Sequence, residues 1–146
     1  MFIPQLAAVA VAGIVSLTGA HHVTNTSELI RSDVAGICLT VESGHVNSDA
    51  CNDAHGKITA TRWRNPSAEF VSVANGECLT ASNGKAVLTS CTGRPAQKWT
   101  YSSDELISKL SGRCVTMPAS ERGQAVMTAC TTGPTFYLQR WITSKS

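Results

Sequence analysis

One pattern of cysteine and tryptophan occurs three times along the chain, and this repetition restricts the possible folds more than any other feature. Each copy begins with a glycine two residues before a cysteine, reaches a second cysteine 13, 13 or 16 residues later, and ends in a tryptophan. Repeats of about 40 residues are typical of chains whose copies bury a common core. The copies, at about 27–66, 67–104 and 105–146, account for every cysteine and tryptophan, which are Cys38, Cys51, Trp63, Cys78, Cys91, Trp99, Cys114, Cys130 and Trp141.

The same repetition favours one disulfide pattern. Six cysteines allow fifteen pairings in principle, and three equivalent copies favour pairing within each copy. Each such bond closes a loop of roughly 15 residues and stabilises the folded chain by about 3 kcal/mol in the chain-entropy description. No two cysteines have the close spacing of structural zinc ligands, so we expect neither a metal nor a cofactor. The expected disulfides are Cys38–Cys51, Cys78–Cys91 and Cys114–Cys130.

The mature chain has the pattern of short β-strands separated by turns. Runs of β-branched and aliphatic residues are bounded by turn signals such as Asn83-Gly84 and Gly133-Pro134. About four strands per copy predict an all-β fold of about twelve strands, each too short to be stable alone. The three copies must therefore close on one another, which also protects the sheet edges. The runs lie at 57–60, 70–73, 86–90, 106–109 and 125–129.

The first twenty residues differ from the rest of the chain. Residues 1–20 carry no charged side chain, and the apolar stretch Leu6–Leu17 is followed by the small residues Thr18-Gly19-Ala20. This order is typical of a secretory signal peptide cleaved near Ala20. The apolar stretch is shorter than the roughly 20 residues that span a membrane, which disfavours the alternative of an uncleaved signal anchor. We therefore expect a secreted, extracellular protein whose mature part, 21–146, is a single domain without a membrane span.

Charge and motifs argue against several classes of function. The net charge is +2 and lysine and arginine do not cluster, so nucleic acid is not an expected partner. The chain contains no Gly-x-Ser-x-Gly motif, and the disulfide pattern leaves no thiol for nucleophilic chemistry. Its aspartates and glutamates show no spacing that indicates a glycosidase pair. We therefore expect a binding protein without catalytic residues.

Two of the three tryptophans end a Gln-x-Trp motif. The motifs are Gln97-Lys98-Trp99 and Gln139-Arg140-Trp141, whereas the first copy has Thr61-Arg62-Trp63. Three tandem repeats of this kind, over about residues 27–143, resemble the ricin B-chain lectin-type β-trefoil. The resemblance implies a β-trefoil in which the tryptophans lie in the core and each glutamine braces a turn. Repeat one is then the loosest, because the side chain of Thr61 is too short to replace the glutamine.

The resemblance also implies carbohydrate binding in shallow pockets, at most one per repeat. Sugar-binding repeats of the family place an aspartate two residues after the first cysteine, where this chain has Thr40, Thr80 and Thr116. A glycan or glycoprotein is then the expected partner of a modified pocket. Repeat one carries the most polar groups near that position, and charged acceptors form the stronger hydrogen bonds. The candidate sugar-binding residues are Thr40, Glu42, His45, Asn47 and Asp49, with a solvated polar loop as the alternative.

Protein binding is a second class of function. Val87 and Val126 stand in repeats two and three at a position where the family often contacts sugar through glutamine, and apolar residues there suit a dry contact with a protein. Degenerate ricin-type repeats resemble the delivery subunits of cytolethal distending toxins, and other trefoils inhibit proteases. A protein-binding trefoil with a partner subunit is therefore the alternative to a lectin, and a structural or cell-surface module is the third.

Overall fold

The computed structural model describes residues 27–51 and 58–145, so the expected signal peptide at 1–20 lies outside the described residues. Within this part the chain forms β-strands and short 3₁₀ helices. No helix of the described part has the length and apolar character needed to cross a membrane. The expected all-β fold of short strands is confirmed, and the sheet has 13 strands, one more than four per repeat.

Each repeat contributes its own group of strands, with a 3₁₀ helix just before the tryptophan strand. Repeat one contains β1 (Glu28–Ser32), β2 (Ile37–Glu42), β3 (His45–Ala50), η2 (Ile58–Thr61) and β4 (Arg62–Arg64). Repeat two contains β5 (Val71–Ser72), β6 (Cys78–Ser82), β7 (Lys85–Thr89), η3 (Pro95–Gln97) and β8 (Trp99–Ser102). Repeat three contains β9 (Glu105–Ser108), β10 (Cys114–Thr116), β11 (Gly123–Gln124), β12 (Val126–Thr128), η4 (Phe136–Gln139) and β13 (Trp141–Lys145).

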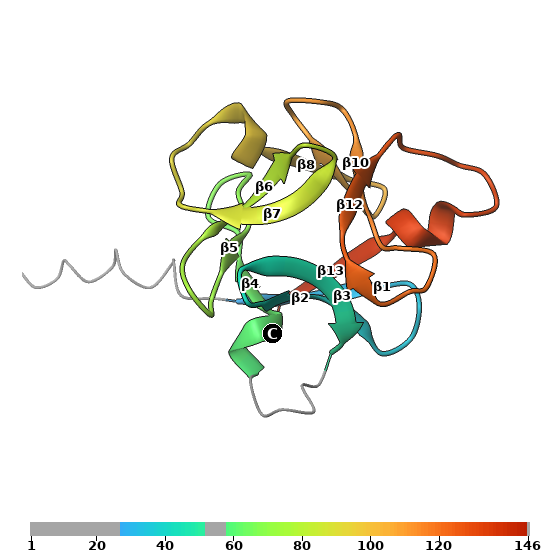
Figure 1. The fold of residues 1–146 in the computed structure, drawn as a ribbon, viewed down its shortest axis with the longest axis horizontal. Helices are drawn as coiled ribbons and strands as arrows, with labels where there is room; N and C mark the ends of the chain where they lie inside the picture. Colours follow the sequence, from blue (N-terminus) through green and yellow to red (C-terminus); the bar gives the residue numbers. More distant parts are fainter. Residues whose placement is uncertain (1–26, 52–57, 146) are drawn as a thin grey trace, which may run out of the picture.

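Three hairpins pair with one another in a ring. They are the antiparallel pairs β2–β3, β6–β7 and β10–β12. Strand β3 pairs with β7 where His45 stands opposite Val87, β7 pairs with β12 where Lys85 stands opposite Val126, and β11 pairs with β3. Figure 1 shows the three hairpins arranged around a common centre. Each hairpin is thus supported by both others, which stabilises strands too short to stand alone.

The first and last described strands lie side by side. β1 pairs antiparallel with β13, from Glu28 opposite Lys145 to Ser32 opposite Trp141. β1 also pairs with β2 and β4 of its own repeat. The pairing therefore joins repeat three to repeat one and closes the three repeats on one another, as the short strands predict.

Two-residue turns set the register of the first two hairpins. Ser43-Gly44 joins β2 to β3 with φ of 51° and 80°, and Asn83-Gly84 joins β6 to β7 with φ of 49° and 76°. Positive φ at both positions defines the turn type whose twist matches that of the flanking strands. The sequence signal at Asn83-Gly84 therefore marks a hairpin turn, and Ser43-Gly44 forms the same turn without the usual asparagine.

The connection between β10 and β12 is longer, because the cysteines of repeat three are 16 rather than 13 residues apart. This connection contains β11, which pairs with β3 through Gly123 opposite Ser48 and Gln124 opposite Asn47. The hydroxyl of Ser48 also donates to the carbonyl of Glu121 at 2.9 Å. The additional residues of repeat three are thus placed against the hairpin of repeat one.

The three tryptophans lie in the hydrophobic core, as expected. Trp63, Trp99 and Trp141 are 0%, 2% and 0% exposed. Each indole N–H donates to the carbonyl of the residue after the first cysteine of its repeat, at 3.0, 3.0 and 2.8 Å. A buried tryptophan N–H needs such an acceptor. The bond ties the last part of each repeat to its hairpin, and it is present in repeat one even without the glutamine.

The prediction of one strand is wrong. The run at 57–60 predicts a strand, but its described residues belong to the 3₁₀ helix Ile58–Thr61. Helices η3 and η4 occupy the same place before Trp99 and Trp141. The fold needs a tight change of chain direction here, so tertiary position overrides the β propensity of the β-branched side chains.

All three expected disulfides are present. Each joins the start of one hairpin strand to the chain just beyond the other, with Cα atoms 4.8, 5.1 and 5.1 Å apart. The bonds therefore fasten the open end of each hairpin, opposite its turn or connection. Cysteine is fully accounted for, because no free cysteine exists among the described residues.

Candidate functional site

The five candidate residues of repeat one share one face of the β2–β3 hairpin. Thr40 stands opposite Asn47, Glu42 stands opposite His45, and Asp49 lies two residues beyond Asn47 on β3. Side chains alternate across a strand, and directly opposed residues of two strands point to the same side. The register therefore brings the whole predicted set to one surface.

Three of the five residues, Thr40, Glu42 and Asp49, line an open hollow of about 710 Å³. Ligand sites in proteins are clefts of roughly 300–1,000 Å³. His45 and Asn47 are not among the described residues that line it, and they lie where β3 meets β7 and β11. The remaining lining residues come from all three repeats and are Val41, Ser43, Gly44, Ala50, Thr59, Ala60, Thr61, Ala74, Asn75 and Arg122.

Thr40 and Asp49, which line this hollow, both have hydrogen-bond or ion-pair partners. The hydroxyl of Thr40 donates to the carbonyl of Asn47 at 3.3 Å. Asp49 Oδ1 accepts from the amide of Ala50 at 2.8 Å and lies 3.5 Å from Arg122 Nη1. The Arg122 and Asp49 side chains are 64% and 47% exposed, so their ion pair is screened and contributes at most about 1 kcal/mol. Separating Arg122 from Asp49 therefore costs little.

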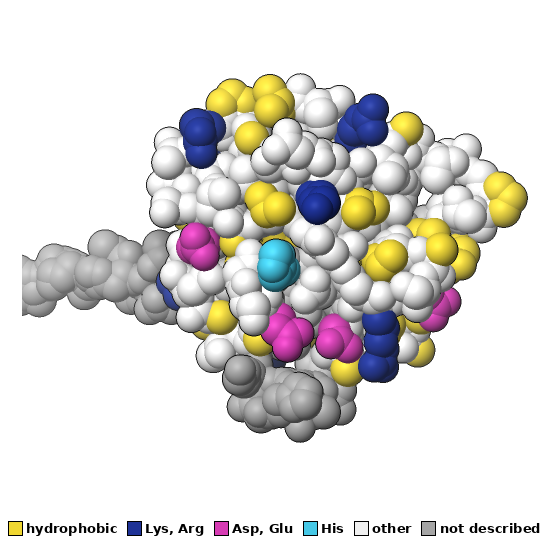
Figure 2. All heavy atoms as spheres, in the orientation of Figure 1, with side chains coloured by type: hydrophobic (Ala, Val, Ile, Leu, Met, Phe, Trp, Pro, Cys, Tyr) yellow, Lys and Arg dark blue, Asp and Glu magenta, His cyan; other side chains and the backbone are white. Residues whose placement is uncertain are grey.

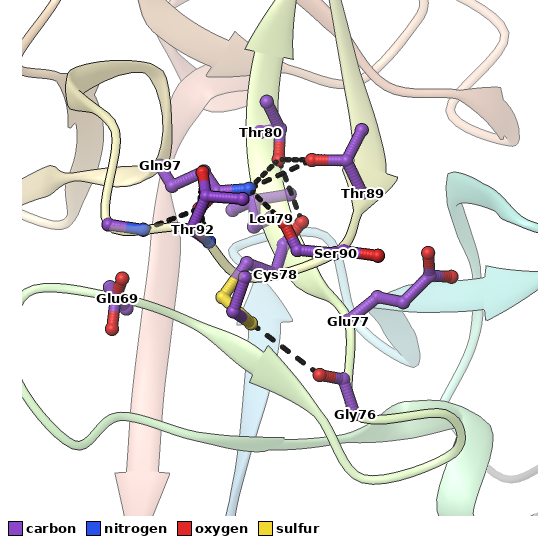
Figure 3. Close-up of a disulfide and its surroundings, with 12 residues drawn as sticks. Glu69, Gly76, Glu77, Cys78, Leu79, Thr80, Thr89, Ser90, Thr92 and Gln97 are labelled. Atoms are coloured by element: carbon purple, nitrogen blue, oxygen red, sulfur yellow. Dashed lines mark hydrogen bonds between the residues drawn. A yellow bond between two sulfur atoms is a disulfide. The ribbon is translucent and has the colours of Figure 1, made fainter.

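In repeat two the equivalent position is closed by hydrogen bonds. The buried side chain of Gln97 reaches Thr80 and Thr89, as Figure 3 shows. Gln97 Nε2 donates to the Thr89 hydroxyl and the Ser90 carbonyl, both at 2.8 Å, and lies 3.3 Å from the Thr80 hydroxyl. Its Oε1 accepts from the amide of Thr92 at 2.8 Å. The glutamine thus braces the turn after the second cysteine, as the resemblance implies.

Repeat three contains the same network. Gln139 Nε2 donates to the hydroxyl of Thr128 at 2.9 Å and the carbonyl of Ala129 at 2.8 Å, and lies 3.1 Å from the hydroxyl of Thr116. Gln139 Oε1 accepts from the amide of Thr131 at 2.8 Å. The Thr116 and Thr128 hydroxyls are 2.7 Å apart, as the Thr80 and Thr89 hydroxyls are 2.8 Å apart. The network is therefore a repeated feature of the chain.

The hydrogen-bond network around the glutamine gives a reason for threonine in two of the three repeats, at the position two residues after the first cysteine where sugar-binding repeats of the family have aspartate. The first reason is that threonine is β-branched, and β-branched side chains are favoured in strands. The structure adds a second reason, because Thr80 and Thr116 each bond to the carbonyl of the preceding cysteine and to the glutamine. Thr40 has a different partner, since repeat one has Thr61 in place of the glutamine.

A smaller hollow of about 280 Å³ lies at the equivalent place in repeat two. It is lined by Thr80 and Thr89, whose hydroxyls are engaged with Gln97, and by apolar Leu110, which is 59% exposed. Val87 and Val126 are half-buried where neighbouring hairpins pair. The valines thus contribute to contacts between hairpins as well as to the surface.

Charges of both signs surround the repeat-one hollow. Glu42 and Asp49 are acidic, and Arg122 is the basic residue among the described residues that line it. Figure 2 shows acidic, basic and hydrophobic side chains interspersed over the face in view.

A group of possible metal ligands in repeat three does not form a metal site. The acidic side chain of Glu105 lies 3.4 Å from Cys114 Sγ, but Cys114 is bonded to Cys130 and offers no thiolate to a metal.

Sequence reasoning missed the contributions of the second and third repeats to this hollow. Asn75 follows β5, and Arg122 precedes β11 in the long connection of repeat three. The spacing of 16 rather than 13 residues between the cysteines was the available signal for an insertion. Sequence alone does not show where that insertion docks, because its contact with β3 is made across the ring of hairpins.

Comparison with known proteins assigns the class of this chain. The model of the ricin-type beta-trefoil lectin domain matches residues 24–141. The chain therefore belongs to the ricin-type β-trefoil lectin family, a class of carbohydrate-binding modules. Among curated proteins, no significant match is found.

Solved structures with the same fold include lectins and a toxin. The C-half of the earthworm R-type lectin in complex with GalNAc has a TM-score of 0.68 and 14% identity, over 83% of this chain and 99% of that one. The β-trefoil lectin of Vibrio vulnificus hemolysin/cytolysin with bound N-acetyl-D-lactosamine has a TM-score of 0.64 and 20% identity, over 84% and 96%. The cytolethal distending toxin of Haemophilus ducreyi has a TM-score of 0.64 and 16% identity, over 79% and 80%. At these identities the likeness concerns the fold.

Some similar chains are much longer than this one. The chain spans 30% of the hemolytic lectin CEL-III, with a TM-score of 0.64, 19% identity and 81% of this chain covered. The trefoil fold thus occurs within larger proteins, and fold does not by itself assign function.

Proposed function

We propose that the chain is a secreted, carbohydrate-binding ricin B-type lectin module with a modified sugar pocket in repeat one. Family membership supports glycan binding. The observation that carries the location is the hollow lined by Thr40, Glu42 and Asp49 on one face of the β2–β3 hairpin. Sugar hydroxyls donate to carboxylates in strong hydrogen bonds and exchange weaker bonds with a threonine hydroxyl. His45 and Asn47, on the same face of the hairpin, belong to the proposed binding surface.

Repeats two and three have no equivalent role in this proposal. The hydroxyls of Thr80 and Thr116 bond to the glutamine and to a second threonine of their own repeat. A sugar would have to break these buried bonds, and leaving one buried group unpaired costs roughly 1–3 kcal/mol. That is a large part of the about 4 kcal/mol of a millimolar ligand. We therefore expect one weak site per chain.

The proposal also covers processing and chemistry. Residues 1–20 act as a signal peptide and 21–146 as one extracellular domain, which the apolar stretch at 6–17 and the disulfides support, since disulfides persist outside the cytosol. Recognition by a shallow polar surface requires no catalysis, so the chain is proposed to bind glycans without turning them over.

Titration of the mature protein with galactosides, glucosides and sialosides tests this function. We expect saturation at one site per chain, and we expect Asp49→Ala to abolish it. Asp33→Ala is the matched control, because Asp33 is also exposed and also pairs with an arginine, at 3.7 Å from Arg140 Nε. Equal binding by Asp49→Ala and wild type, or two to three sites per chain, would place the pocket elsewhere. Absence of binding to every glycan would contradict the lectin function.

A protein-binding trefoil is the second candidate. It is favoured by the small hollow of repeat two, where Leu110 is 59% exposed beside Pro95 and Ala96. A toxin delivery subunit or a protease inhibitor would use such an apolar surface, and the Haemophilus ducreyi toxin has the same fold. Loss of a purified partner's binding on Leu110→Asp, with glycan binding unchanged, would support this candidate.

A further inference from the structure

The chain contains two Asn-Gly pairs, and both asparagines are exposed. Asn75-Gly76 is followed by Glu77, and Asn83-Gly84 is followed by Lys85. The side-chain amide of an asparagine before glycine is reactive, because glycine has no Cβ to hinder attack by its backbone nitrogen on the side-chain carbonyl carbon. The two pairs share this reactivity, so their surroundings in the fold decide which of them reacts.

The reacting groups of Asn75-Gly76 are held by hydrogen bonds. Asn75 Nδ2 donates to Glu77 Oε1 at 3.0 Å, and Asn75 Oδ1 accepts from the Glu77 amide at 2.9 Å. The Gly76 amide, whose nitrogen would be the nucleophile, donates to the carbonyl of Ser72 at 2.8 Å. These bonds must break before the nitrogen can reach the side chain. The Glu77 carboxylate also disfavours negative charge on the attacking nitrogen.

The reacting groups of Asn83-Gly84 have no such restraint. Among the described residues, the Asn83 side chain and the Gly84 amide have no hydrogen-bond partner. The pair forms the two-residue turn between β6 and β7, where the flanking Ser82 and Lys85 are the residues that pair. Attack at Asn83 therefore breaks no hydrogen bond, and the adjacent lysine cation favours an anionic nucleophile.

We propose that Asn83 is a site of spontaneous deamidation in the folded protein, with water as the co-reactant. The Gly84 nitrogen loses its proton and bonds to Asn83 Cγ, while the Cγ–Nδ2 bond breaks and the side-chain nitrogen leaves with that proton as ammonia. Water then opens the resulting succinimide ring at either of its carbonyls. The products are aspartate and an isoaspartyl linkage, in which the backbone runs through the former side chain. This inference depends neither on glycan binding nor on a protein partner.

The modified turn lies at the contact between repeats two and three. The Gly84 carbonyl accepts from the Met127 amide at 2.9 Å, and Lys85 stands opposite Val126 of β12. Aspartate before glycine favours the same turn, so this product keeps the contact and lowers the net charge of +2 by one. The isoaspartyl linkage adds a methylene group to the backbone of a two-residue turn, which displaces the Gly84 carbonyl from Met127.

The test compares both asparagines in the same molecule. The folded protein is incubated at mildly alkaline pH in heavy-oxygen water, which marks the acid that forms, and its peptides are then analysed by mass spectrometry. We expect Asn83 to be converted at least about tenfold faster than Asn75, because the hydrogen bonds that must break at Asn75 are worth about that factor. In urea the ratio should fall, since unfolding releases Asn75. Equal rates in the folded protein, or the same ratio in folded and unfolded protein, would overturn the inference.

Two variants separate the chemistry from the fold. Glu77→Ala removes the acceptor and the negative charge beside Asn75 and should raise the conversion of Asn75 in the folded protein. Asn83→Ser removes the reactive amide and should keep the turn, because Ser43-Gly44 forms the same turn in repeat one. Thermal unfolding of both variants identifies any loss of fold. Unchanged conversion of Asn75 in folded Glu77→Ala would show that its hydrogen bonds do not protect it, which would overturn the assignment.

Hydrogen exchange of the Met127 amide measures the effect on the contact between repeats. After chromatographic separation of the products, this amide should exchange at least about fivefold faster in the isoaspartyl form than in wild type, which is the factor for loss of one hydrogen bond. Asn83→Asp and Asn83→Ser should exchange it at the wild-type rate. Equal exchange in the isoaspartyl form and wild type would contradict the proposed displacement of the turn.

Discussion

Thr40, Thr80 and Thr116 are the same residue at the same place in three repeats, but their hydroxyls have different partners. In repeats two and three the hydroxyl meets a second threonine and a glutamine. In repeat one the Thr40 hydroxyl donates to a backbone carbonyl, that of Asn47, at 3.3 Å. The glutamine two residues before the tryptophan supplies one of these partners in repeats two and three, and repeat one has Thr61 at that position.

At the residue scale we predict a large cost for losing one glutamine. Gln97→Ala removes six hydrogen bonds of 2.8–3.3 Å from a side chain that is 0% exposed and leaves buried polar groups unpaired. The free energy of unfolding, measured in urea, should fall by about 3 kcal/mol, because each unpaired buried group costs roughly 1–3 kcal/mol. Gln124→Ala, at a half-buried glutamine of β11, is the control and should lose less than about 1 kcal/mol. Equal losses for the two variants would refute the bracing role.

At the element scale the three hairpins are similar units with one difference. Two of them close with two-residue turns, and the third has a longer connection that forms β11. The disulfides fasten all three at the same end. The three hairpins therefore share the position of their disulfide but differ in their surfaces. The connection of the third hairpin contains β11, which pairs with β3 of the first.

The fastening leads to a prediction about disulfide removal. Replacing Cys78 and Cys91 together by alanine should lower the free energy of unfolding by about 3 kcal/mol, because the unfolded chain regains the entropy of an open loop. The pair Cys114 and Cys130 should cost nearly the same, since the effect grows only with the logarithm of loop length and the separations are 13 and 16 residues. Urea unfolding of the two double variants tests this. A loss below about 1 kcal/mol in either would show that the bonds do not restrain the unfolded state in this way.

At the scale of the whole molecule, polar side chains join the end of repeat two to the last strand. The Tyr101 hydroxyl lies 2.8 Å from the carbonyl oxygen of Trp141 and 3.0 Å from Asp104 Oδ1. Asp104 Oδ2 accepts from Arg140 Nη2 at 2.7 Å, and Arg140 also lies 3.7 Å from Asp33 of repeat one. These contacts reinforce the closure that β1 and β13 make through their backbones.

This closure should weaken at alkaline pH. Burial, followed by the hydrogen bond to Asp104, raises the pKa of Tyr101 above its ordinary value of 10.0. The unfolded chain then loses the phenol proton at lower pH than the folded chain does. The stabilisation is therefore complete below pH 10.0 and is lost as the pH rises through the folded-state pKa.

The measurement is the urea midpoint between pH 8 and pH 11 in wild type and in Tyr101→Phe. We expect the midpoint of wild type to fall more steeply above pH 10.0 than that of Tyr101→Phe, which has no phenol proton at this position. Tyr137→Phe is the control and should follow wild type. Parallel curves for wild type and Tyr101→Phe would mean that Tyr101 does not couple folding to pH.

Much of the fold could be predicted from residues that recur at fixed spacing. The cysteines predicted their own pairing, and the tryptophans predicted their burial, because both depend on short-range geometry within one repeat. The run at 57–60 was predicted wrongly, since its side chains favour a strand but the chain must turn there before Trp63. The side chains of this run do favour a strand, but the fold of the rest of the repeat requires a turn at this place.

The candidate site divides in the same way. The order of residues predicts the repeats, the disulfides, the buried tryptophans and the set of polar residues on the β2–β3 hairpin, because spacing within a repeat and alternation along a strand are local properties. The packing of the repeats decides that His45 and Asn47 stand apart from the hollow, that Arg122 faces Asp49, and that Thr61 lines the hollow. These relations are made between repeats or across the depth of a pocket, where contacts depend on how three hairpins close around one another rather than on the order of residues in any one of them.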